Sequence, residues 1–378
     1  MEIYLVGGAV RDEFLGLSVH EHDYLVVGAT VSDMLAQGFK PVGRDFPVFL
    51  HPKTGEEYAL ARTERKVGSG YHGFAFHAHP DVTLEQDLAR RDLTINAMAR
   101  APDHRLIDPY HGLNDLHRRR LCHVTSSFSE DPLRIVRVAR FSARFCQLGF
   151  SIDPSTRELM MEMVHNGEFS ALQPERLFRE LEKAMQAPRP DVFFSVLEEV
   201  GALECWAPQL ARKISGWPVD PSAWAFLHFC RHETSPVKRT ALLLAACSDD
   251  AACCKALAQT LHLPKRWSAL AHTACIVWKY AMSQSVLNPD SVIELMDQVD
   301  FWRRKERFFS ALDMIPSLAW AYGRADLGQN ANRIKLAASD IQAFPISRLP
   351  KQYRCLEGKA LGQALHQARR LRLHNLLE

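Results

Sequence analysis

Two adjacent glycines, Gly7 and Gly8, separate a short apolar run at 2–6 from a helix-forming segment that carries Arg11. Glycine has no Cβ, so the backbone can approach a polyphosphate closely, and the first N–H groups of a helix have no partner within it. An arginine one turn into that helix can bind phosphate through two parallel hydrogen bonds. The order strand, glycines, helix therefore predicts a phosphate-binding loop, with a plain turn as the alternative.

Two carboxylates, Glu21 and Asp23, stand at the head of the apolar run at 24–27. Side chains two positions apart in a strand point to the same face, so both can bind one divalent cation or a pair of them. Carboxylate oxygens suit Mg²⁺, and a solvated charged turn is the alternative. A third carboxylate, as general base or further ligand, is expected from Glu57, with Glu56 as its competitor.

An arginine, a carboxylate and an amide stand close together within the segment 90–99, as Arg91, Asp92 and Asn96. Such a group can bind a phosphate or a ribose hydroxyl while its charges stay paired in the empty site. A surface ion pair between Arg91 and Asp92 is the alternative.

Positive charge is concentrated between residues 118 and 144, where seven arginines stand against two acids. At 100° per residue, Arg137, Arg140 and Arg144 lie within about 60° of one another on a helix, and Arg134 lies about 60° further round. One helix face therefore carries a row of guanidinium groups with Asp131 just before it. We predict a site for phosphates and for the edge of a base, with a generic basic helix face as the alternative.

Strands and helices alternate in the part of the chain that must position these residues. Short β-like runs occur at 3–6, 24–27, 47–50, 57–61 and 107. From residue 131 onward, helical patterns recur at 133–146, 174–185, 192–200 and 239–247. The patterns predict a mixed α/β domain followed by helices, and prolines and glycines between 206 and 221 mark a boundary inside the helical part.

The composition is that of a globular chain of two or three domains, with 378 residues, 47% of them hydrophobic and 24% charged. A formal charge of +2 neither indicates nor excludes a nucleic-acid partner. Nine cysteines without a C-x-x-C pair, no secretory signal and no long apolar run predict a reduced, cytoplasmic protein without a membrane span.

Together these motifs resemble the class II tRNA nucleotidyltransferases, the CCA-adding enzymes, and especially their bacterial branch. The segments that carry the likeness are LVGGAVRD (5–12), EHD (21–23), VGRDFPVFL (42–50), EYALARTERK (57–66), RRDLTINA (90–97), DPYHGL (108–113) and EDPLRIVRVARF (130–141). Their order and spacing are highly specific. The likeness is strong up to about residue 210, where PERLFRE (174–180) matches a further segment of the family, and it is faint beyond.

The resemblance implies an α/β nucleotidyltransferase head with a mixed sheet and flanking helices at 1–125. An all-α neck with the nucleotide-selecting residues would follow at 126–210, and a helical body and tail that hold tRNA at 211–378. The implied reaction adds CCA to the tRNA 3′ acceptor end from CTP and ATP, with two Mg²⁺ ions and release of pyrophosphate. The oligomeric state stays open, and a monomer is compatible with the sequence.

The resemblance also implies roles for the candidate residues. Those expected to bind the nucleotide are Gly7, Gly8, Arg11, Arg91, Asp92, Asn96, Asp131, Arg134, Arg137 and Arg140. Glu21 and Asp23 would hold Mg²⁺, with Glu57 as the further catalytic carboxylate. Asp131 and Arg134 would read the incoming base, because a carboxylate accepts from the exocyclic amine of C or A and a guanidinium donates to the adjacent ring acceptor.

Some features depart from the family pattern or leave alternatives open. Glu21 stands where the family usually has Asp, which lengthens the reach by one methylene. The His-Asp signature of an appended phosphohydrolase is absent from 241–250, so no phosphatase or cyclic phosphodiesterase activity is predicted. The segment 66–85 resembles the flexible loop that the family needs for the terminal A. The alternatives are an A-only enzyme, a bacterial poly(A) polymerase and an inactive RNA-binding relative.

Overall fold

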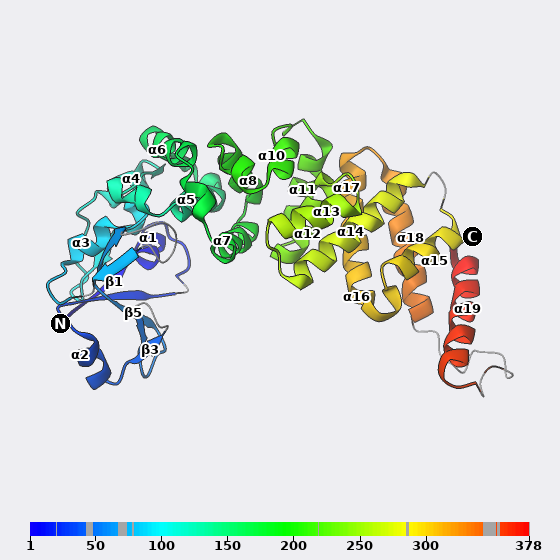
Figure 1. The fold of residues 1–378 in the computed structure, drawn as a ribbon, viewed down its shortest axis with the longest axis horizontal. Coiled ribbons are helices and arrows are strands. Elements are labelled where there is room, and N and C mark those ends of the chain that lie inside the picture. The colour runs from blue at the N-terminus through cyan, green and yellow to red at the C-terminus, as the bar shows by residue number, and fades with distance from the viewer. Residues whose placement is uncertain are drawn as a thin grey trace. The chain divides into compact units, whose positions relative to one another are not determined.

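The computed structural model of the chain describes residues 1–19, 21–42, 48–66, 74–77, 79–217, 219–284, 287–342, 353 and 356–377. The fold divides into two units, Met1–Trp206 and Ala207–Glu378. The strands belong to the first unit (Figure 1). Two predicted features, the loop within 66–85 and the motif at 42–50, lie partly outside the described residues.

A seven-stranded sheet forms the frame of the first unit, with strand order β3-β4-β5-β2-β1-β8-β9. Its strands are β1 (Glu2–Val6), β2 (Asp23–Val27), β3 (Lys40–Val42), β4 (Val48–Leu50), β5 (Glu57–Leu60), β8 (Ala99–Arg100) and β9 (Leu106–Ile107). β2 and β5 run parallel, whereas the other neighbouring strands are antiparallel. The predicted mixed sheet is therefore confirmed.

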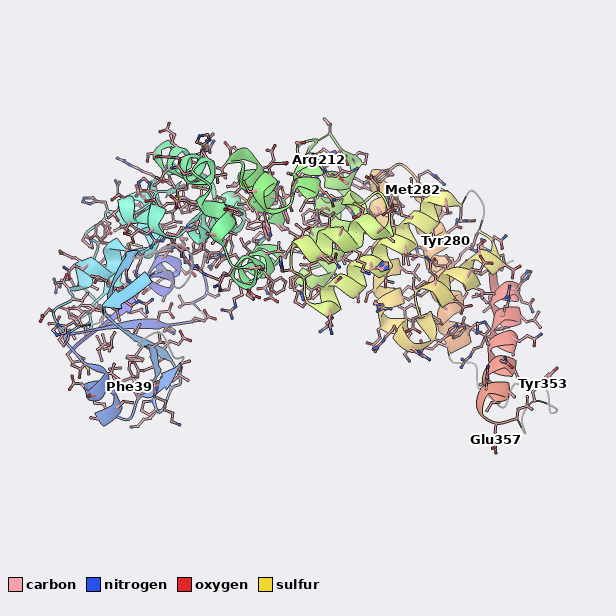
Figure 2. All side chains as sticks on the ribbon, in the orientation of Figure 1. Phe39, Arg212, Tyr280, Met282, Tyr353 and Glu357 are labelled. Carbon is pink, nitrogen blue, oxygen red and sulfur yellow. The ribbon has the colours of Figure 1, made fainter. Side chains whose placement is uncertain are left out.

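Apolar side chains alternate along the strands and give the sheet a core on each face. On one face Leu25 joins a cluster with Leu88 of α3 (Leu84–Ala89). On the other, Val26 joins Met34 of α2 (Val31–Ala36). The second core includes Phe39, labelled in Figure 2, whose ring centre lies 5.0 Å from that of Tyr58. Because successive strand residues face opposite sides, both faces can be covered at once.

The strand register brings one terminus of each of four strands together at the same end of the sheet. Val6, the last residue of β1, pairs with Asp23 at the start of β2 and with Ala99 at the start of β8. Because β5 runs parallel to β2, its first residue, Glu57, also pairs with Asp23. The glycine turn after β1, the predicted acids and the segment before β8 are therefore neighbours, although they are distant in the sequence.

Helices complete the first unit. They are α1 (Gly8–Phe14), α4 (Gly112–His117), α5 (Leu133–Phe145), α6 (Pro154–His165), α7 (Pro174–Gln186), α8 (Pro190–Glu199) and α9 (Ala202–Trp206). Two small sheets pair β6 (Thr63–Lys66) with β7 (Phe74–His77) and β10 (Arg120–Leu121) with β11 (Ser151–Ile152). α5 packs against α7 and α8, and its Val138, Phe141 and Phe145 are buried. Apart from the short strand β11, the regular elements described after residue 131 are helices, as predicted.

The second unit is built from helices in its described residues. They are α10 (Pro208–Ile214), α11 (Pro221–Cys230), α12 (Pro236–Cys247), α13 (Ala251–Thr260), α14 (Lys265–Ser283), α15 (Pro289–Gln298), α16 (Phe301–Leu312), α17 (Ile315–Ala321), α18 (Ala325–Gln342) and α19 (Gly358–Leu377). α12 and α14 pack together in its core. Across the described residues, no helix is long and apolar enough to cross a membrane.

The turn at 108–113 shows why its residue types are needed. The carboxylate of Asp108 accepts hydrogen bonds from the backbone N–H of Gly112 at 2.7 Å and of Leu113 at 2.9 Å, and so caps α4. A Cβ on Gly112 would lie 2.2 Å from the backbone oxygen of Thr94. The position therefore requires glycine because the two backbone segments touch.

We predict that Gly112→Ala lowers the free energy of unfolding by about 2 kcal/mol or more, since one backbone segment must move to admit the methyl group. Urea denaturation followed by circular dichroism measures this change. The control is Gly362→Ala in α19, where a Cβ meets nothing within 4 Å. An unchanged or raised stability for Gly112→Ala would contradict the close approach.

Candidate active site

A pocket of about 920 Å³ opens in the first unit beside the converging strand ends. It is lined by the predicted residues Gly7, Gly8, Arg11, Glu21, Asp23, Arg91, Asp92, Asn96, Asp131, Arg134, Arg137 and Arg140. Glu57 is not part of the lining. Arg144, the fourth member of the predicted arginine row, lines the pocket as well. Residues that the sequence did not single out for the site, among them Arg176 and Lys183, also face it.

Gly7 connects β1 to α1 with a left-handed backbone, at φ +71°. A Cβ there would lie 2.6 Å from a terminal nitrogen of Arg91, so only glycine fits without displacing that side chain. The N–H of Gly7 donates to the carbonyl oxygen of Met98 at 3.0 Å. N–H groups for a phosphate would therefore come from Gly8 onward, at the start of α1.

Arg11 is buried between α1 and α5. Its Nε and one terminal nitrogen each lie 2.8 Å from Oδ1 of Asp12, and its other terminal nitrogen donates to Oδ1 of Asn96. The second oxygen of Asp12 accepts from Arg144 of α5 at 2.8 Å. Burial lowers the pKa of Arg11 to about 10, with Asp12 opposing the shift, so the guanidinium stays charged at neutral pH.

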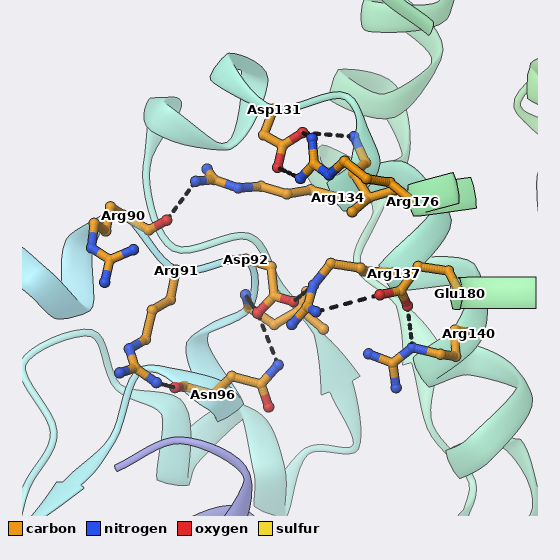
Figure 3. A network of polar contacts seen from close by, with 12 residues as sticks. Arg90, Arg91, Asp92, Asn96, Asp131, Arg134, Arg137, Arg140, Arg176 and Glu180 are labelled. Atoms are coloured by element: carbon orange, nitrogen blue, oxygen red, sulfur yellow. Dashed lines mark hydrogen bonds and ion pairs between the residues drawn. The ribbon is translucent and has the colours of Figure 1, made fainter. Parts of the chain in front are cut away.

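Asp92 lies at the centre of the polar network drawn in Figure 3. Its buried carboxylate accepts from the backbone N–H of Leu93 at 2.8 Å, from Asn96 at 2.9 Å and from Nε of Arg137 at 2.7 Å. Burial by itself would raise the pKa of Asp92, but the charge of Arg137 and these hydrogen bonds hold it far below its usual value. The ion pair joins the segment before β8 to α5.

The local alternative of an ion pair between Arg91 and Asp92 is wrong. Arg91 instead lies 3.4 Å from Oδ2 of Asp87 and donates to the backbone oxygen of Asn96 at 3.4 Å. Asp92 is oriented toward Arg137, which the sequence places 45 residues away. The competition between two arginines for one carboxylate is therefore decided by the tertiary fold.

The arginine row of α5 faces α7, where Glu180 binds two of its members. Glu180 accepts from Nε of Arg140 and lies 3.6 Å from a terminal nitrogen of Arg137 (Figure 3). The guanidinium of Arg140 also lies 4.0 Å from the ring centre of Phe141. The sequence did not indicate a role for Glu180, because nothing in the local pattern of 174–180 specifies which basic side chains it contacts.

The two residues predicted to read the base are both held by neighbours. Asp131 forms a two-pronged pair with Arg176 of α7, with N–O distances of 3.3 Å and 2.7 Å. The terminal nitrogens of Arg134 donate to the backbone oxygens of Ser127 and Arg90. Arg176 is the second residue of α7 that sequence reasoning missed.

The predicted metal-binding carboxylates, Glu21 and Asp23, both face the pocket. Loss of surrounding water raises the pKa of Asp23, Arg91 opposes the rise and the charge of Glu21 adds to it. Glu57 pairs with Asp23 across neighbouring strands, whereas Glu56 lies 3.7 Å from His22. Within the described residues, no three His, Cys, Asp or Glu side chains form a ready-made metal cluster.

The chain resembles known proteins over its whole length. Residues 3–122 match the family described as the poly A polymerase head domain, and residues 149–214 match the one described as the probable RNA and SrmB-binding site of polymerase A. A CCA-adding enzyme of Marinobacter nauticus is 43% identical over 100% of this chain and 99% of its own length. A multifunctional CCA protein of Pseudomonas putida is 45% identical over 97% of this chain and 96% of its own length.

Solved structures share the fold. The Bacillus stearothermophilus CCA-adding enzyme in complex with CTP matches with a TM-score of 0.68 at 21% identity, over 99% of this chain and 88% of its own. The Thermotoga maritima CCA-adding enzyme complexed with tRNA matches with a TM-score of 0.61 at 20% identity, over 99% and 87%.

A mixed-sheet head and a pocket that combines carboxylates with an arginine row define the chain as a nucleotidyltransferase. Its relatives at 43–45% identity share nearly its whole length. The chain belongs to the family of the CCA-adding enzymes, which confirms the resemblance inferred from its motifs.

We predict that Asp92→Asn changes how stability depends on pH. The pKa of Asp92 in the folded chain lies far below its unfolded value of about 3.9, so the wild type loses stability as the pH falls below about 5. In the wild type, Asp92 takes up a proton on unfolding at low pH, and the variant has no carboxylate there to do so. Between about pH 3.5 and 2.5, the free energy of unfolding of the variant should therefore depend on pH less steeply than that of the wild type, by about 1.4 kcal/mol per pH unit. At pH 7 it should be about 3 kcal/mol less stable, because Arg137 loses a buried partner.

Urea denaturation at a series of pH values measures both effects. Asp103→Asn is the matched control, because this carboxylate is 67% exposed and pairs with the surface residue Arg105. Parallel stability curves for the wild type and Asp92→Asn would refute the strong ionisation of Asp92 in the folded chain.

Proposed function

We propose that this protein adds C, C and A to the 3′ end of tRNA, from CTP and ATP and without a nucleic-acid template. The observation that carries the proposal is that one pocket brings together three groups: the carboxylates Glu21 and Asp23, the arginine row of α5, and the pair Asp131 and Arg134. Its volume of about 920 Å³ is large enough for a nucleoside triphosphate. Membership in the CCA-adding family supports the same reaction.

In this proposal the triphosphate binds to Gly8, Arg11, Arg91, Arg137 and Arg140. A guanidinium has five N–H donors, so an arginine that is held by a carboxylate keeps others for phosphate oxygens. Arg140 is held by Glu180 through Nε, which leaves its two terminal nitrogens for a ligand. The acids thus orient the arginines, and the substrate completes their hydrogen bonding.

Asp131 and Arg134 are proposed to read the base. Cytosine and adenine each present an amine donor beside a ring acceptor, whereas uracil and guanine present the reverse order. A carboxylate and a guanidinium side by side complement the first pattern. Both residues line the pocket, and both side chains are held by hydrogen bonds that fix their position before a nucleotide arrives.

Nucleotidyltransferases of this kind are generally metal-dependent. Glu21 and Asp23 are proposed to hold Mg²⁺, with Glu57 on the neighbouring strand as the third carboxylate. The donor set fits a hard divalent cation, because the raised pKa of Asp23 reflects a carboxylate that is deprived of water and lies near a second negative charge. When bound, such ions would stabilise charge on the attacking and leaving oxygens.

The proposed reaction is an in-line displacement at the α-phosphate. The tRNA 3′-hydroxyl oxygen forms a bond to the α-phosphorus and gives up its proton to solvent, the bond from this phosphorus to the α,β-bridging oxygen breaks, and pyrophosphate leaves. The arginines of α5 and Arg11 stabilise the charge that gathers on the leaving group. We further propose that residues 1–125 act as the head, 126–210 as the neck and 211–378 as the part that holds tRNA.

The test is incubation of the protein with Mg²⁺ and a tRNA that lacks its last three nucleotides. CTP alone should add two residues, and CTP with ATP should add three and then stop. Continued addition of A would instead identify a poly(A) polymerase. A product that forms only on tRNA already ending in CC would identify an A-only enzyme.

We predict that Asp23→Asn lowers the rate of incorporation by about 1,000-fold or more, because loss of one metal ligand removes several kcal/mol of transition-state stabilisation. Binding of tRNA, measured by filter retention, should remain within twofold. Glu56→Gln is the matched control, because this carboxylate is oriented toward His22 and Thr54 and should leave incorporation unchanged. Full activity of Asp23→Asn would refute the metal assignment.

A further inference from the structure

A two-pronged ion pair links α7 to the start of α5. The terminal nitrogens of Arg176 donate to Oδ1 of Asp131 at 3.3 Å and to Oδ2 at 2.7 Å. The side chains are 25% and 19% exposed, so the pair is mostly withdrawn from water and both residues still line the pocket. An arginine fork of this kind fixes the plane of a carboxylate as well as its position.

Asp131 needs such a partner because of where it stands in the chain. It follows a short 3-10 helix at Ser126–Glu130 and precedes α5, with an extended backbone at φ −121°. The backbone N–H of Leu133 donates to Oδ1 of Asp131 at 3.1 Å. This single hydrogen bond does not fix the position of Oδ2, because the carboxylate can still rotate. The second prong of Arg176 fixes that oxygen.

The fork also limits what Asp131 can accept. A carboxylate offers about four lone-pair sites. Leu133 and one prong of Arg176 use Oδ1, and the other prong uses part of Oδ2. Among the described residues this leaves a single acceptor site, on Oδ2, which is what one N–H of an exocyclic amine requires.

α7 holds Arg176 rigidly. Arg176 and Glu180 stand one turn apart on the same face of α7, and Glu180 binds Arg140 of α5. The adjacent side of α7 buries Leu177, Leu181 and Ala184. The position of Arg176 is therefore fixed by helix packing and by a second ion pair, and it does not depend on a bound nucleotide.

We infer that Arg176 is a positioning residue for base selection: it orients the Asp131 carboxylate so that one acceptor meets the amine of C or A. The inference rests on the proposed function. Without the fork, the Asp131 carboxylate could rotate out of the plane of the base and away from its exocyclic amine, and the preference for an amine donor over a carbonyl acceptor would weaken. Binding of the triphosphate depends on other arginines and should persist.

The test compares single-nucleotide incorporation of CTP and UTP into tRNA that lacks CCA, and of ATP and GTP into tRNA ending in CC. For Arg176→Gln we expect the ratio of kcat/KM for CTP over UTP to fall by about tenfold or more, the size of effect expected for a charge-assisted hydrogen bond. The ratio for ATP over GTP should fall similarly. Arg176→Lys, which keeps the charge but not the fork, should restore part of the selectivity.

Arg179→Gln is the matched control, since Arg179 is an exposed arginine on the same helix. A purely structural ion pair would lower incorporation of all four nucleotides in the same proportion, and that result would overturn the inference. If Arg176→Gln proves unfolded by circular dichroism, Arg176→Lys decides, because undiminished selectivity there would also overturn it. A wild-type protein that fails to add C and A would instead refute the proposed function.

Discussion

The ion pair between the buried Asp92 and the half-buried Arg137 is the contact on which the pocket depends. Placing a carboxylate in the interior costs several kcal/mol unless it is fully paired. Here Asp92 receives three hydrogen bonds, and Arg137 lies between Asp92 and Glu180. The carboxylate belongs to the sheet-bearing part of the unit and the guanidinium to α5. The sheet-bearing part and α5 form two walls of the pocket, and each carries a charge whose partner lies on the other wall.

Pairing with an acid also holds two other arginines that line the same face of α5. Guanidinium groups crowded into one pocket repel one another, and acids from three different segments offset that repulsion: Asp12 beside Arg144, Asp92 beside Arg137, and Glu180 beside Arg140. The side chains of the pocket are thus ordered as well as basic. Donors that are already oriented need little rearrangement when a charged ligand enters, which is the condition under which electrostatic stabilisation is most effective.

The sequence predicted what depends on local spacing. The helical period placed Arg134, Arg137, Arg140 and Arg144 on one face, and all of them line the pocket. Short apolar runs predicted the strands. The order of strand, glycines and helix predicted a phosphate-binding loop after β1, which stays a prediction. The fold class and the family followed from these patterns and are confirmed.

Pairing between distant segments could not be predicted in this way. The partner of Arg140 lies 40 residues away and that of Arg176 lies 45 residues away, so no local pattern specifies them. The register that sets Glu57 beside Asp23 depends on β5 running parallel to β2, and short apolar runs do not indicate direction. The role of Glu57 as a third carboxylate therefore stays a prediction.

In the proposed mechanism, the limited hydrogen-bonding capacity of Asp131 determines how many of the four bases the site accepts. One acceptor beside one guanidinium divides the four bases into two classes, with C and A together in one of them. Such a pair of residues accepts C and A in the same way, so it cannot by itself determine which of the two is added at a given step. Under this proposal, the order C, C, A must therefore depend on a feature outside the pair of Asp131 and Arg134.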